Sequence, residues 1–197
     1  MLNSAEKVLY LIFFLPFFGI REYYSARYRK KPGVRGEHGI LDIFLLALGG
    51  VGLTLPLVYV FSPLLDFAHY PRPAWLNIPG GFLLILGSIL LWFSHHALGR
   101  NWTAGTGVTG EQEMVDTGIY RWLRHPMYTA HILWALGTVF LLPNWLAGLA
   151  FLPGALLIPW TRISQEEARL VQRFGDAYGD YRKKTPALFP RLSGRIS

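Results

Sequence analysis

Cysteine is absent from this sequence of 197 residues. Its absence excludes disulfide bonds, thiol nucleophiles, haem attachment through thioethers and zinc sites with cysteine ligands. Charged residues are also few: they make up 16% of the chain, whereas a soluble domain carries about 25%. Hydrophobic residues make up 52%, and the mean hydropathy is +0.29. This composition indicates a membrane protein with a modest polar part.

Features of soluble nucleotide-binding proteins are missing as well. The glycine-rich stretch 99–110 has no Gly-Lys-Ser/Thr, no strand before it and no βαβ unit around it, which excludes a phosphate-binding loop. We expect a flexible loop that covers a site instead. The formal net charge is +7, but the ladder of basic and aromatic residues that single-strand nucleic-acid binders use is absent. The arginines are therefore expected to face anionic lipid on the cytoplasmic side.

Apolar segments long enough for membrane helices recur along the chain. There are five of them: 7–28, 40–62, 80–98, 126–142 and 145–163. A membrane helix needs about 20 apolar residues, which some of these segments reach only with their flanking residues. No Ala-x-Ala-like cleavage site follows the first segment, which favours a membrane helix over a signal peptide. We predict an all-α integral membrane protein with about five transmembrane helices, folded as one domain over residues 1–197.

The distribution of arginine and lysine predicts the orientation of these helices. Three connecting segments are rich in basic residues: 21–38, 99–127 and 162–195. Two are poor in them: 63–79 and 143–144. Because cytoplasmic loops carry the excess of Arg and Lys, we expect the N-terminus outside and the C-terminus in the cytosol. The cytosolic tail 164–197 begins with an amphipathic helix that Gly175 ends.

Two polar clusters flank the last two apolar segments. The first stands at the start of the fourth segment: Arg124, His125 and Tyr128. Pro126 suits the first turn of a helix, so backbone N–H groups beside this cluster are expected to be unpaired and available to a carboxylate. Glu166 and Glu167 follow the fifth segment, and carboxylates suit ribose hydroxyls or an ammonium group better than phosphates. We expect the two clusters to close one cofactor site at the cytosolic membrane surface.

Several of these polar residues also have a simpler structural interpretation. Arg124 can reach lipid headgroups, and Glu166 can pair with an arginine at i+3 on a solvated helix face. His95 and His96 are adjacent, and adjacent side chains point about 100° apart on a helix, which favours interfacial histidines over ligands of a metal. No metal site is predicted. His131 lies deeper in the fourth segment, where it either lines a cavity or bonds to a neighbouring helix.

Several motifs follow one another between residues 98 and 190. They are Leu98-Gly99-Arg100-Asn101-Trp102, Val115-Asp116-Thr117-Gly118-Ile119-Tyr120, Arg124-His125-Pro126-x-Tyr128, Arg162 before Glu166-Glu167, Phe174-Gly175-Asp176-x-Tyr178-x-x-Tyr181 and Leu188-Phe189-Pro190. In this order and spacing they resemble the isoprenylcysteine carboxyl methyltransferase family, which overlaps with the phospholipid methyltransferases. The resemblance is strong from about residue 95 to 192, and the short chain looks like the prokaryotic members.

The resemblance implies a membrane enzyme that uses S-adenosyl-L-methionine and has no Rossmann domain. The positions that match its cofactor-binding residues are Val115, Gly118, Tyr120, His125, Tyr128, Glu166 and Glu167. Arg124 matches an arginine that meets an acidic substrate group, and Asn101 and Trp102 match a loop near the substrate entrance. The implied acceptor is a lipid or lipidated substrate from the bilayer, first of all the carboxylate of an isoprenylcysteine-like molecule. Neither nucleic acid nor an obligate protein partner is implied.

The nature of the acceptor and of the reaction leaves alternatives. A carboxylate is already ionised, with a reference pKa of about 3.5, whereas a phospholipid amine or a small thiol would have to lose a proton and the sequence shows no dedicated base. An NADPH-dependent membrane reductase of the sterol-reductase type shares related C-terminal motifs, but a phosphate-rich cofactor would need arginines where Glu166 and Glu167 stand. A non-catalytic lipid-binding protein would show no affinity for S-adenosylhomocysteine. The motifs favour the methyltransferase.

Overall fold

The computed structural model describes residues 4–28, 39–102 and 113–190, and within them the chain is helical without a strand. The long helices are α1 (Ser4–Tyr28), α2 (Ile40–Phe61), α3 (Asn77–Leu98), α4 (Pro126–Leu141) and α6 (Leu152–Phe174). The short ones are α5 (Trp145–Leu149), α7 (Asp176–Lys184) and the 3-10 turns η1 (Asp66–Ala68), η2 (Ala74–Leu76), η3 (Gly99–Asn101) and η4 (Gly118–Arg121). The predicted all-α class is confirmed.

Three helical stretches of the described chain are long and apolar enough to cross a membrane. They are Ile43–Phe61, Ala74–Asn101 and Trp145–Phe174. The α4 helix is apolar but has 16 residues, so it is about 24 Å long and shorter than the hydrocarbon core of about 30 Å. The α1 helix has 25 residues but carries charged side chains near both ends. The count of five spans therefore stays a prediction.

The helix boundaries differ from the expected spans in two places. The α3 helix begins at Asn77 rather than at residue 80, because η2 leads directly into it. The segment 145–163, expected as one span, is divided between α5 and α6. From Leu152 the α6 helix runs unbroken to Phe174, so the expected amphipathic helix is the continuation of a membrane helix. Gly175, with a φ of +57°, ends it as expected.

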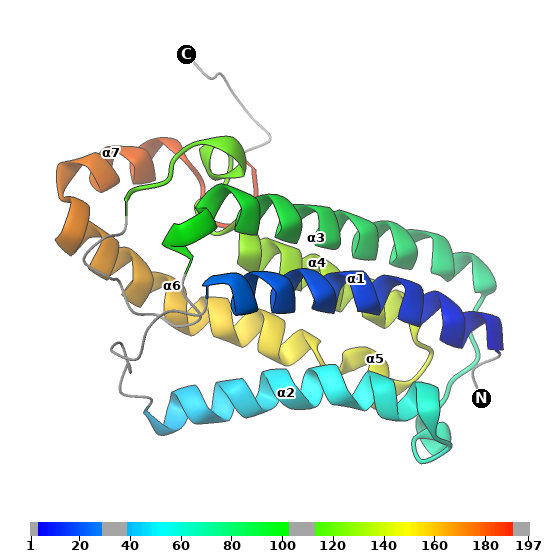
Figure 1. Cartoon of the computed structure of the whole chain (residues 1–197). Helices are drawn as coiled ribbons and strands as arrows, with labels where there is room; N and C mark the ends of the chain where they lie inside the picture. The colour runs from blue at the N-terminus through cyan, green and yellow to red at the C-terminus, as the bar shows by residue number, and fades with distance from the viewer. Residues whose placement is uncertain (1–3, 29–38, 103–112, 191–197) are drawn as a thin grey trace.

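The long helices lie side by side in the order α1, α3, α4, α6 and α2 (Figure 1). Along the chain the directions of the long helices alternate, so the neighbours α1 and α3 run parallel and the connections gather at two ends of the bundle. We call the end with residues 99–102, 113–125 and 175–190 the motif end, and the end with residues 62–76 and 142–151 the opposite end. Arg124 and the C-terminal part of α6 meet at the motif end, and the N-terminus lies at the opposite end.

The core of the bundle is centred on Trp134 of α4, which is fully buried. Its ring stacks on Phe17 of α1 with the centroids 4.7 Å apart, and it meets Phe151 edge-on at 5.5 Å. Close packing of α3 on α4 requires a glycine, because a Cβ atom on Gly87 would lie 2.9 Å from the carbonyl oxygen of Ala130. This packing fixes the depth of the first turn of α4 relative to α3.

One buried side chain, Asn144, holds the loops of the opposite end together. Its Oδ1 accepts hydrogen bonds from the N–H groups of Leu146 at 3.0 Å and Ala147 at 2.9 Å, and so caps α5. Its Nδ2 donates to the carbonyl oxygen of Leu65 at 2.6 Å. Asn144 therefore links the α4–α5 turn to the connection between α2 and α3.

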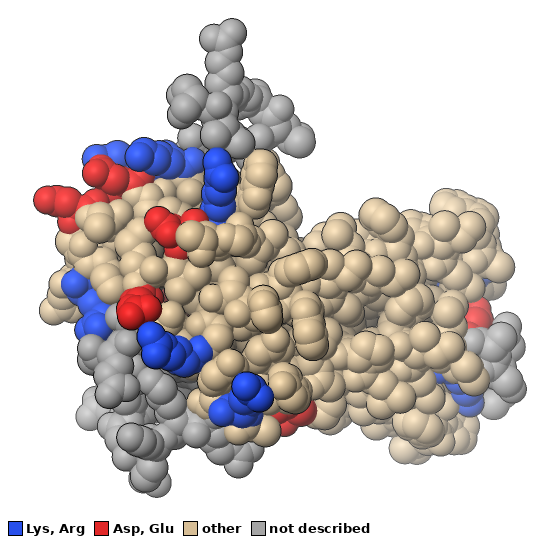
Figure 2. Space-filling model, turned by 45° about the horizontal axis from the view of Figure 1, so that its top comes forward, with Lys and Arg blue, Asp and Glu red and all other residues tan. Residues whose placement is uncertain are grey.

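Charged side chains are concentrated at the motif end, whereas most of the helical surface is apolar (Figure 2). Large apolar side chains point outward along the helices; for example, Trp160 is 86% exposed. A continuous apolar surface of this kind is stable only when lipid covers it. The protein is therefore a membrane protein, with its polar part at one end of the helices.

Two predicted loops lie outside the described residues. They are the basic loop, of which residues 29–38 are not described, and the glycine-rich stretch, of which residues 103–112 are not described. Gly105, Gly107 and Gly110 have the spacing GxGxxG, but the elements before them are the helix α3 and the turn η3. The strand that a dinucleotide-binding loop follows is absent from the described part of the chain.

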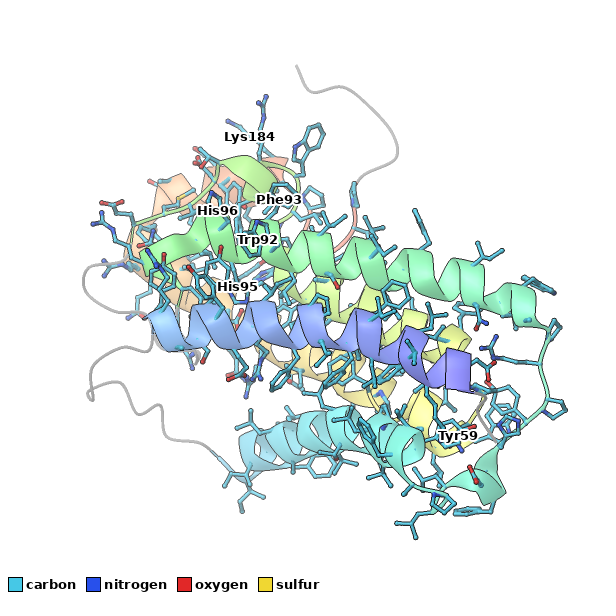
Figure 3. The ribbon with its side chains drawn as sticks, turned by 45° about the vertical axis from the view of Figure 1, so that its right-hand side comes forward. Tyr59, Trp92, Phe93, His95, His96 and Lys184 are labelled. Carbon is cyan, nitrogen blue, oxygen red and sulfur yellow. The ribbon has the colours of Figure 1, made fainter. Side chains whose placement is uncertain are left out.

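The orientation can be tested with single cysteines, because the chain has no thiol of its own. Phe67, which is 80% exposed, lies at the opposite end, and Lys184 lies at the motif end (Figure 3). We expect a membrane-impermeant maleimide to label Phe67→Cys in intact spheroplasts and Lys184→Cys only after permeabilisation. The reverse pattern would show that the motif end faces outward.

Candidate functional site

The chain turns sharply just before α4, and this turn places the first polar cluster. Gly118 has a φ of +60°, a conformation that side chains other than glycine rarely adopt, and it begins η4 beside Ala97 of α3. Pro126 occupies the first turn of α4, as expected. Arg124 and His125 thus stand directly before a helix whose axis continues into the membrane.

Glu167 of α6 is the centre of the site. Its side chain is 8% exposed, and its Oε1 lies 2.8 Å from Nε and 2.7 Å from Nη2 of Arg124. The same oxygen lies 3.1 Å from Nε2 of His125. The other oxygen, Oε2, faces Nε of Arg182 at 3.4 Å. Both ends of this carboxylate therefore have partners inside the protein, so the two predicted clusters meet here.

Glu166 lies beside this centre and has more open surface. The hydroxyl of Tyr128 donates to its Oε1 at 2.6 Å, and its Oε2 lies 3.7 Å from Nδ1 of His125. Its side chain is 25% exposed. Glu166 is therefore the carboxylate of the pair that a ligand can reach, whereas Glu167 is enclosed by its partners.

The C-terminal segment is fastened directly over the first cluster. Nη1 of Arg124 donates to the carbonyl oxygen of Arg182 at 3.0 Å and also to that of Thr185. The backbone N–H groups of Arg124 and His125 donate to the carbonyl oxygens of Pro186 and Ala187, each at 2.9 Å. The expectation that these N–H groups stay unpaired was wrong. Carbonyl oxygens of the tail accept the hydrogen bonds that a carboxylate was expected to accept.

Buried tyrosines and a threonine complete this attachment. Tyr181 donates its hydroxyl to the carbonyl oxygen of Tyr120 at 2.6 Å, and Thr129 donates to that of Leu188 at 2.6 Å. Burial, together with the charge of Glu167, raises the pKa of Tyr178 to about 12. Burial also raises the pKa of Tyr181. Both phenols therefore keep their protons at neutral pH, and Tyr181 acts as a donor.

The other predicted site residues lie in the segment 113–121, which leads to the first cluster, or at the end of α3. Gly118 and Tyr120 lie on η4, and the half-buried Val115 precedes it. Asn101 accepts a hydrogen bond from the N–H of Glu113 at 3.2 Å. These residues lie at the same end of the bundle as the two clusters (Figure 1).

Trp102 lies next to a histidine that was expected to be interfacial. The ring of Trp102 meets that of His95 edge-on at 5.1 Å. His95 is only 2% exposed and stacks on Tyr24 of α1 at 4.9 Å. His95 thus packs between helices in the last turn of α3, whereas His96 is exposed. The structure places Trp102 over the contact between α1 and α3.

Two residues of the site were not singled out from the sequence. Arg182 was read only as part of a basic run, and Thr185 acts through its backbone carbonyl. The side chain of Thr185 lies 3.5 Å from the carbonyl oxygen of Arg121. A contact made by a backbone carbonyl leaves no trace in residue type, so no residue pattern indicated it.

Comparison with known proteins agrees with this geometry. The model of the isoprenylcysteine carboxyl methyltransferase (ICMT) family matches residues 81–172, which include the α3–α4 packing and both clusters. Over this region, slightly less than half of its length, the chain is similar to this family. Among its relatives, the protein-S-isoprenylcysteine O-methyltransferase of Schizosaccharomyces pombe is 46% identical over 83 residues, which are 40% of this chain and 34% of that protein. The methyltransferase of Xenopus laevis is 32% identical over 126 residues, 61% of this chain and 42% of that protein.

Other relatives match over most of their length, at lower identity. Protein-S-isoprenylcysteine O-methyltransferase B of Arabidopsis thaliana is 26% identical over 183 residues, 88% of this chain and 90% of that protein. The solved structure of a eukaryotic intramembrane Ras methyltransferase ICMT aligns with a TM-score of 0.59 and 23% identity. It covers 94% of this chain and 65% of that chain. The arrangement of helices in this chain is thus similar to that of the solved intramembrane methyltransferase.

The ion pair between Arg124 and Glu167 predicts how the tail is held. Glu167→Gln removes the charge and leaves Arg124 uncompensated, which costs about 3 kcal/mol of unfolding free energy for a buried pair. We expect a lower melting temperature and faster hydrogen exchange at the N–H groups of Arg124 and His125, measured by mass spectrometry. Asp180→Asn breaks only an exposed pair with Lys183 and should change neither. Unchanged exchange in Glu167→Gln would contradict the role given to this pair.

Proposed function

We propose that this protein is an S-adenosyl-L-methionine-dependent methyltransferase of the membrane that transfers a methyl group to the carboxylate of an isoprenylcysteine-like acceptor. The observation that supports this most is the open carboxylate of Glu166. It is held by Tyr128 beside a closed network of charges, at the point where a membrane helix leaves the apolar surface. Such a site can bind a polar cofactor on one side and a lipid-borne acceptor on the other.

The chemistry of the donor set fits this cofactor. Arg124 and Arg182 both face the buried Glu167, and Arg162 also acts on Tyr128, but the carboxylate that a ligand can reach is that of Glu166. A phosphate-rich cofactor would meet a negative charge there. Ribose hydroxyls, an ammonium group and a sulfonium group are all served by a carboxylate and a hydroxyl. The residues that would hold the cofactor are Glu166, Tyr128 and His125. Val115, Gly118 and Tyr120, in the segment 113–121, would lie beside it.

The transfer itself needs little acid–base chemistry. When bound, the cofactor would supply a methyl group on a sulfonium; an oxygen of the acceptor's carboxylate would form the new C–O bond as the C–S bond breaks, with its electron pair staying on sulfur. No proton moves, since the acceptor is already ionised. The work of this chain is therefore to exclude water, align the acceptor and keep its charge stable at low dielectric.

Arg124 is the residue proposed to meet the acceptor's carboxylate. A guanidinium has five N–H groups, and the contacts to Glu167, to Arg182 and to Thr185 use four of them. The side chain of Arg124 also forms a hydrogen bond with that of Tyr178. Glu167 and the tail therefore fix the direction in which Arg124 presents its charge. The positive charge of Arg124, rather than a free N–H group, would then attract the acceptor's carboxylate.

The proposal also states where the acceptor comes from, the bilayer, and on which side of the membrane it is methylated. Relatives of this chain carry the name protein-S-isoprenylcysteine O-methyltransferase, and the site opens where the apolar surface begins. We place the site on the cytosolic side, where Arg and Lys are abundant and soluble cofactors are available. A phospholipid amine or a thiol is the less favoured acceptor, because either would have to lose a proton before the transfer, whereas a carboxylate is already ionised.

The proposal is tested first by cofactor binding, with S-adenosylhomocysteine and NADPH as parallel ligands in calorimetric titrations of the purified protein. We expect micromolar binding of S-adenosylhomocysteine and none of NADPH. Glu166→Gln removes a charged hydrogen-bond acceptor and should weaken this binding about tenfold. Glu22→Gln, on the exposed surface of α1, is the matched control and should bind normally. Binding of NADPH alone would favour a reductase, and binding of neither would favour a lipid-binding protein.

A further inference from the structure

The last described residues of the tail run from the candidate site toward the membrane. The carbonyl oxygens of Pro186 and Ala187 accept hydrogen bonds from the residues just before α4, whereas that of Leu188 accepts one from Thr129 inside the helix. Thr129 is the fourth residue of α4, about 4.5 Å from its start. Phe189 follows Leu188 directly, so it lies near the depth of Thr129.

The neighbouring helix α3 shows what surrounds Phe189 at this depth. Gly87 of α3 faces the carbonyl oxygen of Ala130 of α4, and the two helices run in opposite directions. Thr129 is therefore level with about residues 88–90 of α3, which lie inside a span with apolar, outward-facing side chains. The side chain of Phe189 is 58% exposed. Its ring thus stands beside the surface that lipid covers.

A second aromatic ring and two cations lie next to the same part of the tail. The hydroxyl of Thr185 donates to the carbonyl oxygen of Arg121 at 3.5 Å, so the end of η4 meets the tail directly after Lys184. Trp122, which follows Arg121, is 52% exposed. Lys184 lies beside the end of α3 that carries the exposed Phe93 (Figure 3). Aromatic and basic side chains therefore gather where the apolar surface ends.

The charges of the two cations are left without an ion pair. Lys183 binds the carboxylate of Asp180 at 2.8 Å, and Lys184 acts on that carboxylate only at longer range. Within residues 4–28, 39–102 and 113–190, neither Arg121 nor Lys184 forms an ion pair. Aromatic rings at headgroup depth and cations beside them are the combination that binds an anionic leaflet.

We propose that Arg121, Trp122, Lys184 and Phe189, the lipid anchor, bind the anionic headgroup layer of the leaflet around the motif end, and that this contact holds the tail closed over the candidate site. The two rings would insert at the headgroup boundary, and the two cations would meet lipid phosphates. Residues 185–188, between two members of the anchor, supply the carbonyl oxygens that bind the start of α4 and the residues before it. Contact with lipid at both ends of this stretch opposes its opening, whichever acceptor is methylated.

The depth of the lipid anchor is tested with single cysteines, since the chain has no thiol of its own. The cysteine of Phe189→Cys carries a fluorophore in nanodiscs of the whole protein, and lipids with a nitroxide near the headgroup serve as quenchers. We expect strong quenching there. Asp176→Cys, on the exposed first turn of α7 beyond the end of α6, is the control and should be quenched little. Equal quenching at the two positions would overturn the inference.

The effect of lipid charge is tested by hydrogen exchange at the N–H groups of Arg124 and His125, which exchange when their bonds to the tail open. The two samples are nanodiscs of phosphatidylcholine and nanodiscs of an equal mixture with phosphatidylglycerol. Each cation near an anionic surface contributes about a factor of five, so we expect exchange about 25-fold slower in the mixture. In the double variant Arg121→Gln with Lys184→Gln this difference should vanish.

The matched control removes two positive charges from α1 at the same end of the bundle: Arg21→Gln with Arg27→Gln. Both side chains are exposed, and neither contacts the tail, so this variant should keep the difference between the two lipids. Equal exchange of wild-type protein in the two lipids would overturn the inference. A difference that survives in the double variant of Arg121 and Lys184 would overturn it as well.

Discussion

The buried carboxylate of Glu167 is the constraint on which the rest of the motif end depends. A charge removed from water costs several kcal/mol unless opposite charges and hydrogen bonds compensate it. Arg124 and His125, directly before α4, and Arg182 of α7 supply that compensation. The ion pairs therefore join α6, the start of α4 and the tail at one point. The same contacts fix the guanidinium of Arg124, which then binds two backbone carbonyls of the tail.

The two adjacent glutamates have different roles in this arrangement. Neighbouring residues on a helix point about 100° apart, so Glu167 faces the interior while Glu166 faces Tyr128 and the open part of the site. The first carboxylate stabilises the site and the second is available to a ligand. Because α6 is continuous from the membrane to Phe174, both are held at a constant depth relative to the bilayer. A cofactor from water and an acceptor from lipid can then meet at one place.

Much of this arrangement could be predicted from residue types, and the remainder could not for identifiable reasons. Runs of apolar residues predict the long helices, and the spacing of Arg124 and the two glutamates indicates a shared site. The pairing of the tail with Arg124 and His125 was missed because it uses backbone carbonyls, which every residue has. The break between the helices α5 and α6, within one candidate span, was missed because an apolar run does not show where a helix breaks. The burial of His95 depends on Tyr24 of α1, a contact distant in sequence.

The central claim is that this site transfers a methyl group to a carboxylate at the membrane surface. The most direct measurement follows radioactive methyl from S-adenosylmethionine in proteoliposomes that contain an S-farnesylcysteine acceptor. The account predicts label in the lipid fraction that mild alkali releases as volatile methanol, since only a methyl ester is cleaved in this way. Label that resists alkali would show methylation of nitrogen or sulfur, and absence of label from the lipid fraction of a protein that binds the cofactor would contradict the proposed acceptor.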